Sequence, residues 1–128
     1  MSGIPARFAV RCISPAPAVD VSYELPQLVV GALHRPQRTL RRAGGKSFNV
    51  ARVLAGLGAE PVVVGPVGGP GGAWLVAEAE REGIAFAALP IEGYQTRTCV
   101  SLCPVGDPAH PTEVDEPAPE LGQAGWRE

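Results

Sequence analysis

The spacing of hydrophobic and polar residues changes along the chain, and each change marks an element of secondary structure. The apolar run at 7–14 predicts a short strand. The segment 61–67, PVVVGPV, is rich in β-branched residues and predicts a strand buried on both faces of a parallel sheet. Further strands are predicted at 84–91 and 96–105. The hydrophobic pattern therefore indicates a sheet with at least four strands.

Helical spacing appears twice. The four apolar residues at i, i+3, i+4 and i+7 predict one stripe of an amphipathic helix: Val50, Val53, Leu54 and Leu57. Ser47 is placed to cap this helix, and Gly58 is placed to end it. A second helix is predicted from Ala73 to Glu82, followed by Gly83. The last segment, 121–128, is similar to the opening of a third amphipathic helix.

Residues 21–42 have a different character. Pro26 and Pro36 confine this segment to edge strands or to a flap. Its polar alternation and its arginines predict a two-stranded flap that projects from the main sheet. The order strand, flap, helix, strand, helix, strand predicts one α/β domain over 1–128, with a mostly parallel sheet and a small β lid at 21–42.

The composition narrows the class of protein. The 128 residues are 45% hydrophobic and 19% charged, which is typical of a globular domain. A net charge of -2 argues against a general nucleic-acid binder. The N-terminus has no signal-peptide pattern and no apolar run is long enough to span a membrane, so we expect a cytoplasmic protein. The three cysteines are expected to be reduced, and we expect no metal site.

The most informative stretch is the glycine pair before the first helix, Gly44-Gly45-Lys46-Ser47. It is not a P-loop, because Leu40 stands where that motif requires its first glycine. We expect the glycine pair to form a turn with at least one residue at positive φ, and Ser47 either to cap the helix or to take a strained backbone. The pair also leaves backbone N–H groups unshielded, and a helix N-terminus favours an anionic or hydroxyl-rich ligand. Lys46, the only lysine in the chain, adds a charge suited to phosphate. The alternative is a tight turn with a solvated Asn49.

This stretch resembles the first signature of the ribokinase-like (PfkB) carbohydrate kinases. The positions that match that signature are Gly44, Gly45, Lys46, Asn49, Ala51, Gly58 and Gly68. Ser47 departs from it, because glycine, alanine or proline is usual there. The segment SPAPAVDVSYEL resembles the family's N-P-A-x-D motif, with Asp20 as its aspartate and Ala16 in place of Asn.

Three further segments resemble the phosphosugar branch of that family, which contains 1-phosphofructokinase and tagatose-6-phosphate kinase. GALHR followed by RTLRRAGGK resembles the lid strands. TRT at 96–98 matches the branch's T-R-x motif, whose arginine contacts the substrate phosphate. TEVDEPAP at 112–119 resembles T-E-x-N-E-P-G-P, with Asp115 for Asn and Ala118 for Gly.

The resemblance implies a ribokinase-like fold and the phosphorylation of a sugar phosphate by ATP. It implies a sugar-phosphate site made of Asp20, Gly44, Gly45, Lys46, Asn49, Arg97 and Arg35. The family's catalytic G-A-G-D motif is absent from the sequence. We therefore expect the chain to carry the substrate-side half, with no catalytic residue and with the ATP and Mg²⁺ sites elsewhere. The alternative is a non-catalytic sugar-phosphate binding or interaction module.

The sequence leaves alternatives open for single residues. Asp20 could be a helix cap or a solvated turn residue, and Arg97 could serve a structural salt bridge. The flap arginines lack interleaved aromatic residues, which favours a phosphosugar lid or a solvated flap over a nucleic-acid stripe. In family members the flap often pairs with a second subunit, so we expect a homodimer through it. We also expect Asp20, Lys46, Asn49 and Arg97 to meet in one cleft.

Overall fold

The computed structural model describes residues 8–123 and 127. The elements in chain order are β1 (Ala9–Ile13), β2 (Ala18–Leu25), β3 (Arg38–Gly44), α1 (Lys46–Gly56), β4 (Glu60–Val67), α2 (Gly69–Glu82), β5 (Ala85–Pro90), β6 (Arg97–Pro104) and β7 (Thr112–Asp115). No helix among the described residues is long and apolar enough to cross a membrane.

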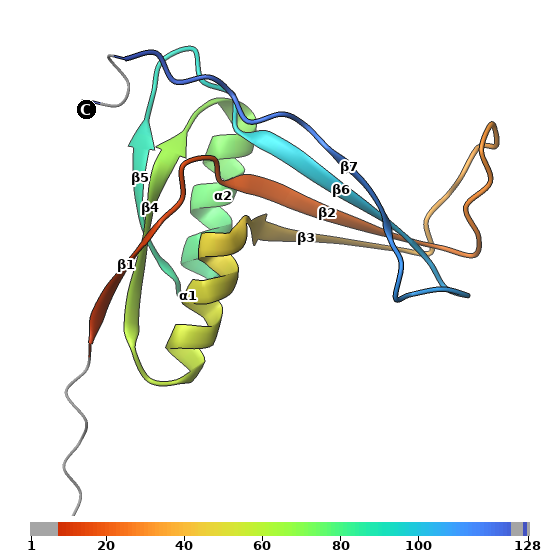
Figure 1. Cartoon of the computed structure of the whole chain (residues 1–128), viewed down its shortest axis with the longest axis horizontal. Helices are drawn as coiled ribbons and strands as arrows, with labels where there is room; N and C mark the ends of the chain where they lie inside the picture. Colours follow the sequence, from red (N-terminus) through yellow and green to blue (C-terminus); the bar gives the residue numbers. More distant parts are fainter. Residues whose placement is uncertain (1–7, 124–126, 128) are drawn as a thin grey trace, which may run out of the picture.

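The strands form two separate sheets. One is a three-stranded parallel sheet in the order β1-β4-β5. The other has four strands in the order β3-β2-β6-β7. In Figure 1 the two helices lie along one face of the parallel sheet, and the long strands of the second sheet extend away from them. We call the second sheet, β3-β2-β6-β7, the lid sheet.

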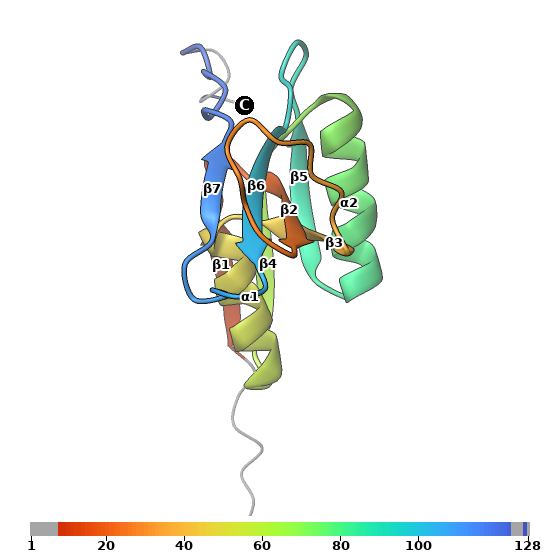
Figure 2. The same cartoon turned by 90° about the vertical axis from the view of Figure 1, so that its right-hand side faces the viewer.

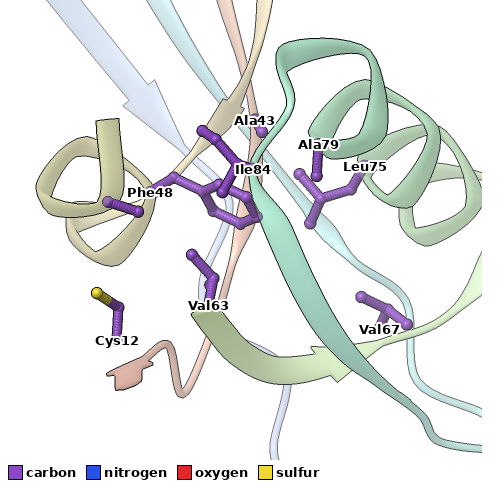
Figure 3. Close-up of a cluster of buried hydrophobic side chains, with 9 residues drawn as sticks. Cys12, Ala43, Phe48, Val63, Val67, Leu75, Ala79 and Ile84 are labelled. Carbon is purple, nitrogen blue, oxygen red and sulfur yellow. The ribbon is translucent and has the colours of Figure 1, made fainter. Parts of the chain in front are cut away.

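The hydrophobic core lies between the helices and the parallel sheet. Figure 3 shows Phe48 of α1 and Leu75 of α2 approaching the same group of side chains from the two helices. The Phe48 side chain is fully buried and meets Phe86 of β5 edge to face, with ring centroids 5.1 Å apart. The buried cluster consists of Cys12, Ala43, Phe48, Ala51, Val63, Val67, Leu75, Ala79 and Ile84.

The predicted stripe of the first helix is wrong at three of its four residues, and only Leu54 packs, partly buried, against the core. Val50, Val53 and Leu57 are 51%, 63% and 78% exposed, while the helix buries Phe48 and Ala51. The helix is therefore turned so that its largest apolar side chain fills the core. The small Ala51, one turn further on, lets the helix lie close to the sheet.

Strand β4 belongs to a parallel sheet, as the sequence predicted, and is its central strand, but its two faces differ in burial. Val63 and Val67 are buried beneath the helices, whereas Val62 and Val64 on the other face are only half buried. The expectation of burial on both faces is thus met on one face within the described residues.

The N-terminal cap of α1 also differs from the prediction. Gly45 occupies the cap position, with φ 100°, and the helix starts at Lys46. This confirms the expected glycine at positive φ beside Ser47. Ser47 neither caps the helix nor adopts a strained backbone; its hydroxyl donates to the Ile13 carbonyl at 2.6 Å. Ser47 therefore ties the first turn of α1 to the end of β1.

The second helix ends where the sequence predicted but begins earlier. Gly83 follows its last turn in the left-handed conformation, with φ 73°. The helix starts at Gly69, four residues before the predicted start, and its first turn contains glycines and Pro70. Proline is well tolerated there, since that position has no intrahelical N–H partner to lose.

The lid sheet is larger than the predicted two-stranded flap. β2 and β3 do pair antiparallel, but β6 runs parallel to β2 and β7 pairs with β6. The segment 96–105, assigned from the sequence to the main sheet, thus belongs here. β2 is also not an edge strand. Pro26 and Pro36 lie in the loop between β2 and β3, where they remove no ladder hydrogen bond.

The predicted helix at 121–128 receives no support from its described part. Residues 121–123 are not helical. Residues 124–126 and 128 lie outside the described residues.

Truncating Phe48 tests the placement of the core. We expect Phe48→Ala to lower the free energy of unfolding by about 3–5 kcal/mol, because it opens a cavity where both helices meet the sheet. The matched control is Val50→Ala, on the exposed face of the same helix, which should stay within about 0.5 kcal/mol of the wild type. Urea denaturation measures both. Equal losses would contradict the observed rotation of α1.

Candidate functional site

A cavity of about 410 Å³ lies between the lid sheet and the N-terminus of α1. It is lined by Ala18, Asp20, Ser22, Arg42, Gly45, Lys46, Asn49, Arg97, Cys99, Ser101, Glu113 and Asp115. Figure 2, which looks onto the lid sheet with α1 behind it, shows how these elements stand together. Every strand of the lid sheet contributes to this cavity.

The register of the lid sheet explains this collection of polar residues. Alternate residues of a strand point to the same face, so Asp20 and Ser22 share one face of β2 and Arg97 and Cys99 share one face of β6. The other face of β2 carries apolar side chains such as Val21. Asp20 stands opposite Arg42 and Cys99, and Cys99 in turn stands opposite Asp115. The four residues form one row across the sheet.

The four residues expected to meet do so. Asp20, Lys46, Asn49 and Arg97 all line this cavity, although they come from three elements that are distant in the sequence. Arg35 does not line it, because it lies exposed in the loop between β2 and β3. That loop extends beyond the end of β2, away from the row that contains Asp20. The assignment of these residues as sugar-phosphate ligands stays a prediction.

The glycine pair holds Asp20 in place. A Cβ atom on Gly44 would overlap the Asp20 carboxylate, so only glycine allows this approach. The backbone N–H of Gly45, at the N-terminus of α1, donates a hydrogen bond to the same carboxylate. Asp20 is therefore held by the turn rather than solvated in it. Gly44 is buried behind it, and Gly45 faces the cavity.

Burial dominates the electrostatics of Asp20. It raises the pKa of the carboxyl group above its usual value, and Asp115 adds to this effect. The Gly45 hydrogen bond and the positive charges of Arg52 and Arg97 act in the opposite direction. Asp20 is thus a partly desolvated acceptor whose negative charge is costly. Hydrogen-bond donors on a ligand would relieve this cost.

Arg97 is oriented by the backbone. Its Nε donates to the Ala16 carbonyl and its Nη1 donates to the Glu116 carbonyl, each at 3.3 Å. Both acceptors are neutral, so these hydrogen bonds orient the guanidinium without neutralising its charge. The backbone N–H of Thr98 donates to the Glu116 carboxylate at 2.8 Å, which fixes the segment after β7 beside Arg97. This arrangement suits an anionic ligand better than the structural salt bridge considered from the sequence.

The cavity contains residues that the sequence reading did not select. These residues include Arg42, Glu113 and Asp115. With them, the lining of the cavity carries three positively charged and three negatively charged side chains. Asp115 had a signal in the sequence, because it occupies the asparagine position of the T-E-x-N-E-P-G-P-like segment. Cys99 and Ser101 had none, because their place depends on the pairing of β6 with β2. The lining is therefore suited to a ligand that carries both hydroxyl groups and an anion.

The described residues offer no cluster of side chains suited to a metal ion. Within 8–123 and 127, no group of three or more His, Cys, Asp or Glu side chains is arranged to hold a metal ion. We therefore assign no metal ligand to this part of the chain and derive no phosphoryl-transfer step from it.

Solved structures share this fold. Phosphofructokinase-2 from Escherichia coli in complex with substrates and products matches with a TM-score of 0.84 at 23% identity, over 94% of this chain and 38% of that one. The same enzyme in complex with fructose-6-phosphate matches with a TM-score of 0.83 at 24% identity, over 92% and 38%. A possible 1-phosphofructokinase from Thermotoga maritima matches with a TM-score of 0.82 at 26% identity, over 94% and 38%.

The parallel α/β unit with its β lid is therefore the ribokinase-like kinase fold. A family model described as pfkB family carbohydrate kinase matches residues 14–114. The chain belongs to the pfkB family of carbohydrate kinases. It spans about 38% of the length of the solved kinases that it matches.

Cys99 offers a test of the cavity's electrostatics. Burial, together with Asp115 and Asp20, raises the pKa of its thiol to about 11, despite the opposing charge of Arg97. Because the thiolate is the reactive form, alkylation of Cys99 by iodoacetamide should speed up roughly tenfold per pH unit from pH 8 to 10. Peptide mass spectrometry measures this rate, with the urea-unfolded chain as control. A rate that levels off near pH 9 would show that the thiol is not desolvated.

Proposed function

We propose that this chain forms the sugar-phosphate side of a kinase that transfers phosphate from ATP to a sugar phosphate, of the 1-phosphofructokinase or tagatose-6-phosphate kinase type. The observation that carries the proposal is the cavity itself. It brings Gly45, Lys46 and Asn49 of the family signature together with Asp20 and with Arg97 of the T-R-x motif. A carboxylate suited to sugar hydroxyl groups and a guanidinium suited to phosphate thus line one cavity.

The side chains that line the cavity suit two different parts of a sugar phosphate. Asp20 is a desolvated acceptor at a helix N-terminus and suits the hydroxyl groups of a sugar. Asn49 lies one turn into α1 beside it. Arg97 is oriented with its charge unneutralised by its backbone partners, and a guanidinium matches phosphate geometry. Lys46 supplies a second cation at the same cavity. We assign Arg97 and Lys46 to the phosphate and Asp20 and Asn49 to the sugar.

The known complexes of similar proteins agree with this class of ligand. Phosphofructokinase-2 from Escherichia coli has been solved with fructose-6-phosphate. Because this chain spans 38% of that protein's length, ATP and Mg²⁺ are proposed only for a complete kinase. The proposal assigns substrate binding, and not phosphoryl transfer, to the described residues. A sugar-phosphate binding module without catalysis would use the same cavity, and an assay for ATP consumption separates the two.

Removing Arg97 tests the phosphate assignment. A charge-assisted contact is worth roughly 1.5–3 kcal/mol, so Arg97→Ala should weaken fructose 1-phosphate binding about ten- to a hundredfold. Binding of free fructose should change far less. Calorimetric titration of both ligands measures the difference.

The matched control for this titration is Arg35→Ala. Arg35 lies in the loop outside the cavity, so its removal should leave both affinities unchanged. Equal losses of fructose and fructose 1-phosphate affinity in Arg97→Ala would refute the phosphate role.

We further propose that the tip of the lid sheet pairs with a second copy of the chain. Val30 and Leu33 in the loop after β2 are 99% and 79% exposed. Beside them lies an apolar cavity of about 330 Å³, lined by Tyr23, Leu25, Leu28, His34, Pro36 and Leu102. Protruding apolar side chains next to an apolar hollow are self-complementary across a two-fold axis. A tetrameric form of Escherichia coli phosphofructokinase-2 has been solved, so assembly occurs in a protein of this fold.

A charge at the loop tip tests this assembly. Val30→Asp should raise the dimer dissociation constant at least about tenfold, because a carboxylate would be buried in an apolar hollow. Sedimentation equilibrium measures the constant. Val53→Asp, an equivalent change on the exposed face of α1, is the control and should leave it unchanged. A monomeric wild-type chain, or equal effects of both changes, would contradict the proposal.

A further inference from the structure

One guanidinium beside the cavity connects α1, α2 and the turn that holds Asp20. Arg52 donates from Nε to Glu82 at 2.6 Å and from Nη2 to Glu82 at 2.8 Å. Its Nη2 also donates to the Ala43 carbonyl, and its Nη1 donates to the Asn49 side-chain oxygen Oδ1 at 3.0 Å. The side chains of Arg52 and Glu82 are each 17% exposed. The hydrogen bonds to Glu82 and Ala43 are therefore partly buried, whereas the one to Asn49 is exposed.

The contact with Asn49 decides which end of its amide a ligand can meet. An asparagine amide has an accepting oxygen and a donating NH₂ group. Arg52 donates to this oxygen and so fixes the amide, which leaves both Nδ2 hydrogens available to a ligand in the cavity. Asn49 is itself exposed, and an exposed amide without this contact would be free to rotate. Arg52 thus makes Asn49 a fixed donor, suited to the oxygen atoms of a sugar phosphate.

The contact with Ala43 acts on the end of β3. Ala43 directly precedes the Gly44–Gly45 turn, and the Gly45 amide holds the Asp20 carboxylate. The same guanidinium therefore fixes the strand end that leads into this turn. Glu82, the last residue of α2, anchors the guanidinium through a bidentate pair, the strongest geometry for such a contact.

A second arginine–glutamate pair offers a comparison within the molecule. Arg81 and Glu78 form an ion pair within α2, and the Arg81 side chain is 72% exposed. Neither residue lines the cavity. This pair lies within one helix, whereas Arg52 of the Arg52–Glu82 pair also contacts Asn49, which lines the cavity.

We infer that Arg52, held by Glu82, is a positioning residue that orients the Asn49 amide as a hydrogen-bond donor toward the sugar-phosphate cavity. The inference rests on the proposed function of that cavity. A clamp that served only to hold α1 against α2 would change stability when removed but would leave the Asn49 amide and the ligand affinity of the folded chain unaltered.

Asn49 is the only asparagine in the sequence, which makes the test direct. A chain labelled with ¹⁵N-asparagine gives a single side-chain NH₂ pair in an NMR spectrum. In Arg52→Lys, which keeps the charge but loses the planar fork, we expect this pair to move toward the shifts of a solvated amide. Fructose 1-phosphate affinity should fall about five- to tenfold, the loss expected from one misplaced hydrogen bond. Arg81→Lys, the matched control, should leave both unchanged.

The two readouts separate this inference from the proposed function. An unchanged NH₂ pair in folded Arg52→Lys overturns the inference, whatever the affinity. A shifted pair with unchanged affinity overturns the positioning role. If Arg52→Lys does not fold, Glu82→Gln, which weakens the anchor but keeps a hydrogen bond, should give the same shift in milder form, and no shift there overturns the inference. A wild-type chain that binds no sugar phosphate refutes the proposed function, while the NMR shift still tests whether Arg52 orients Asn49.

Discussion

The candidate site depends on one close approach, that of the Asp20 carboxylate to the Gly44–Gly45 turn. Gly44 must lack a side chain for β2 and β3 to bring the carboxylate so near, and the Gly45 amide must point at it. This contact joins the lid sheet to the first turn of α1, so the cavity forms where the two parts of the fold meet. The cost of burying Asp20 is offset partly by the helix N-terminus, and a hydroxyl-bearing ligand would offset more of it.

The features that the sequence predicted well are those set by neighbouring residues. The glycine at positive φ, the end of α2 at Gly83 and the β-branched strand β4 each follow from a few adjacent residues. The resemblance to the family motifs also predicted that residues distant in the sequence would meet in one cleft. The chemistry of each single residue left its role open. Arg97 is the clearest case, because nothing near it in the chain shows that it lies across a cavity from Asn49.

The incorrect predictions concern mostly features that depend on contacts between distant segments. The lid sheet gained β6 and β7 because β6 pairs with β2 across more than seventy residues, which no local pattern specifies. The same pairing places Cys99 and Asp115 in the site. The stripe on α1 was misread because periodicity shows that apolar residues share a face but not which face meets the core; the size of Phe48 decided that. Ser47 has the chemistry of a cap, yet Gly45 takes that position and frees the hydroxyl for β1.

The central claim is that a single cavity receives the sugar at Asp20 and the phosphate at Arg97. A crystal structure of the chain with fructose 1-phosphate tests it most directly. The account predicts phosphate oxygens within hydrogen-bond distance of the Arg97 guanidinium and sugar hydroxyls within that distance of the Asp20 carboxylate. A ligand bound with its phosphate away from Arg97, or outside the cavity between the lid sheet and α1, would contradict it.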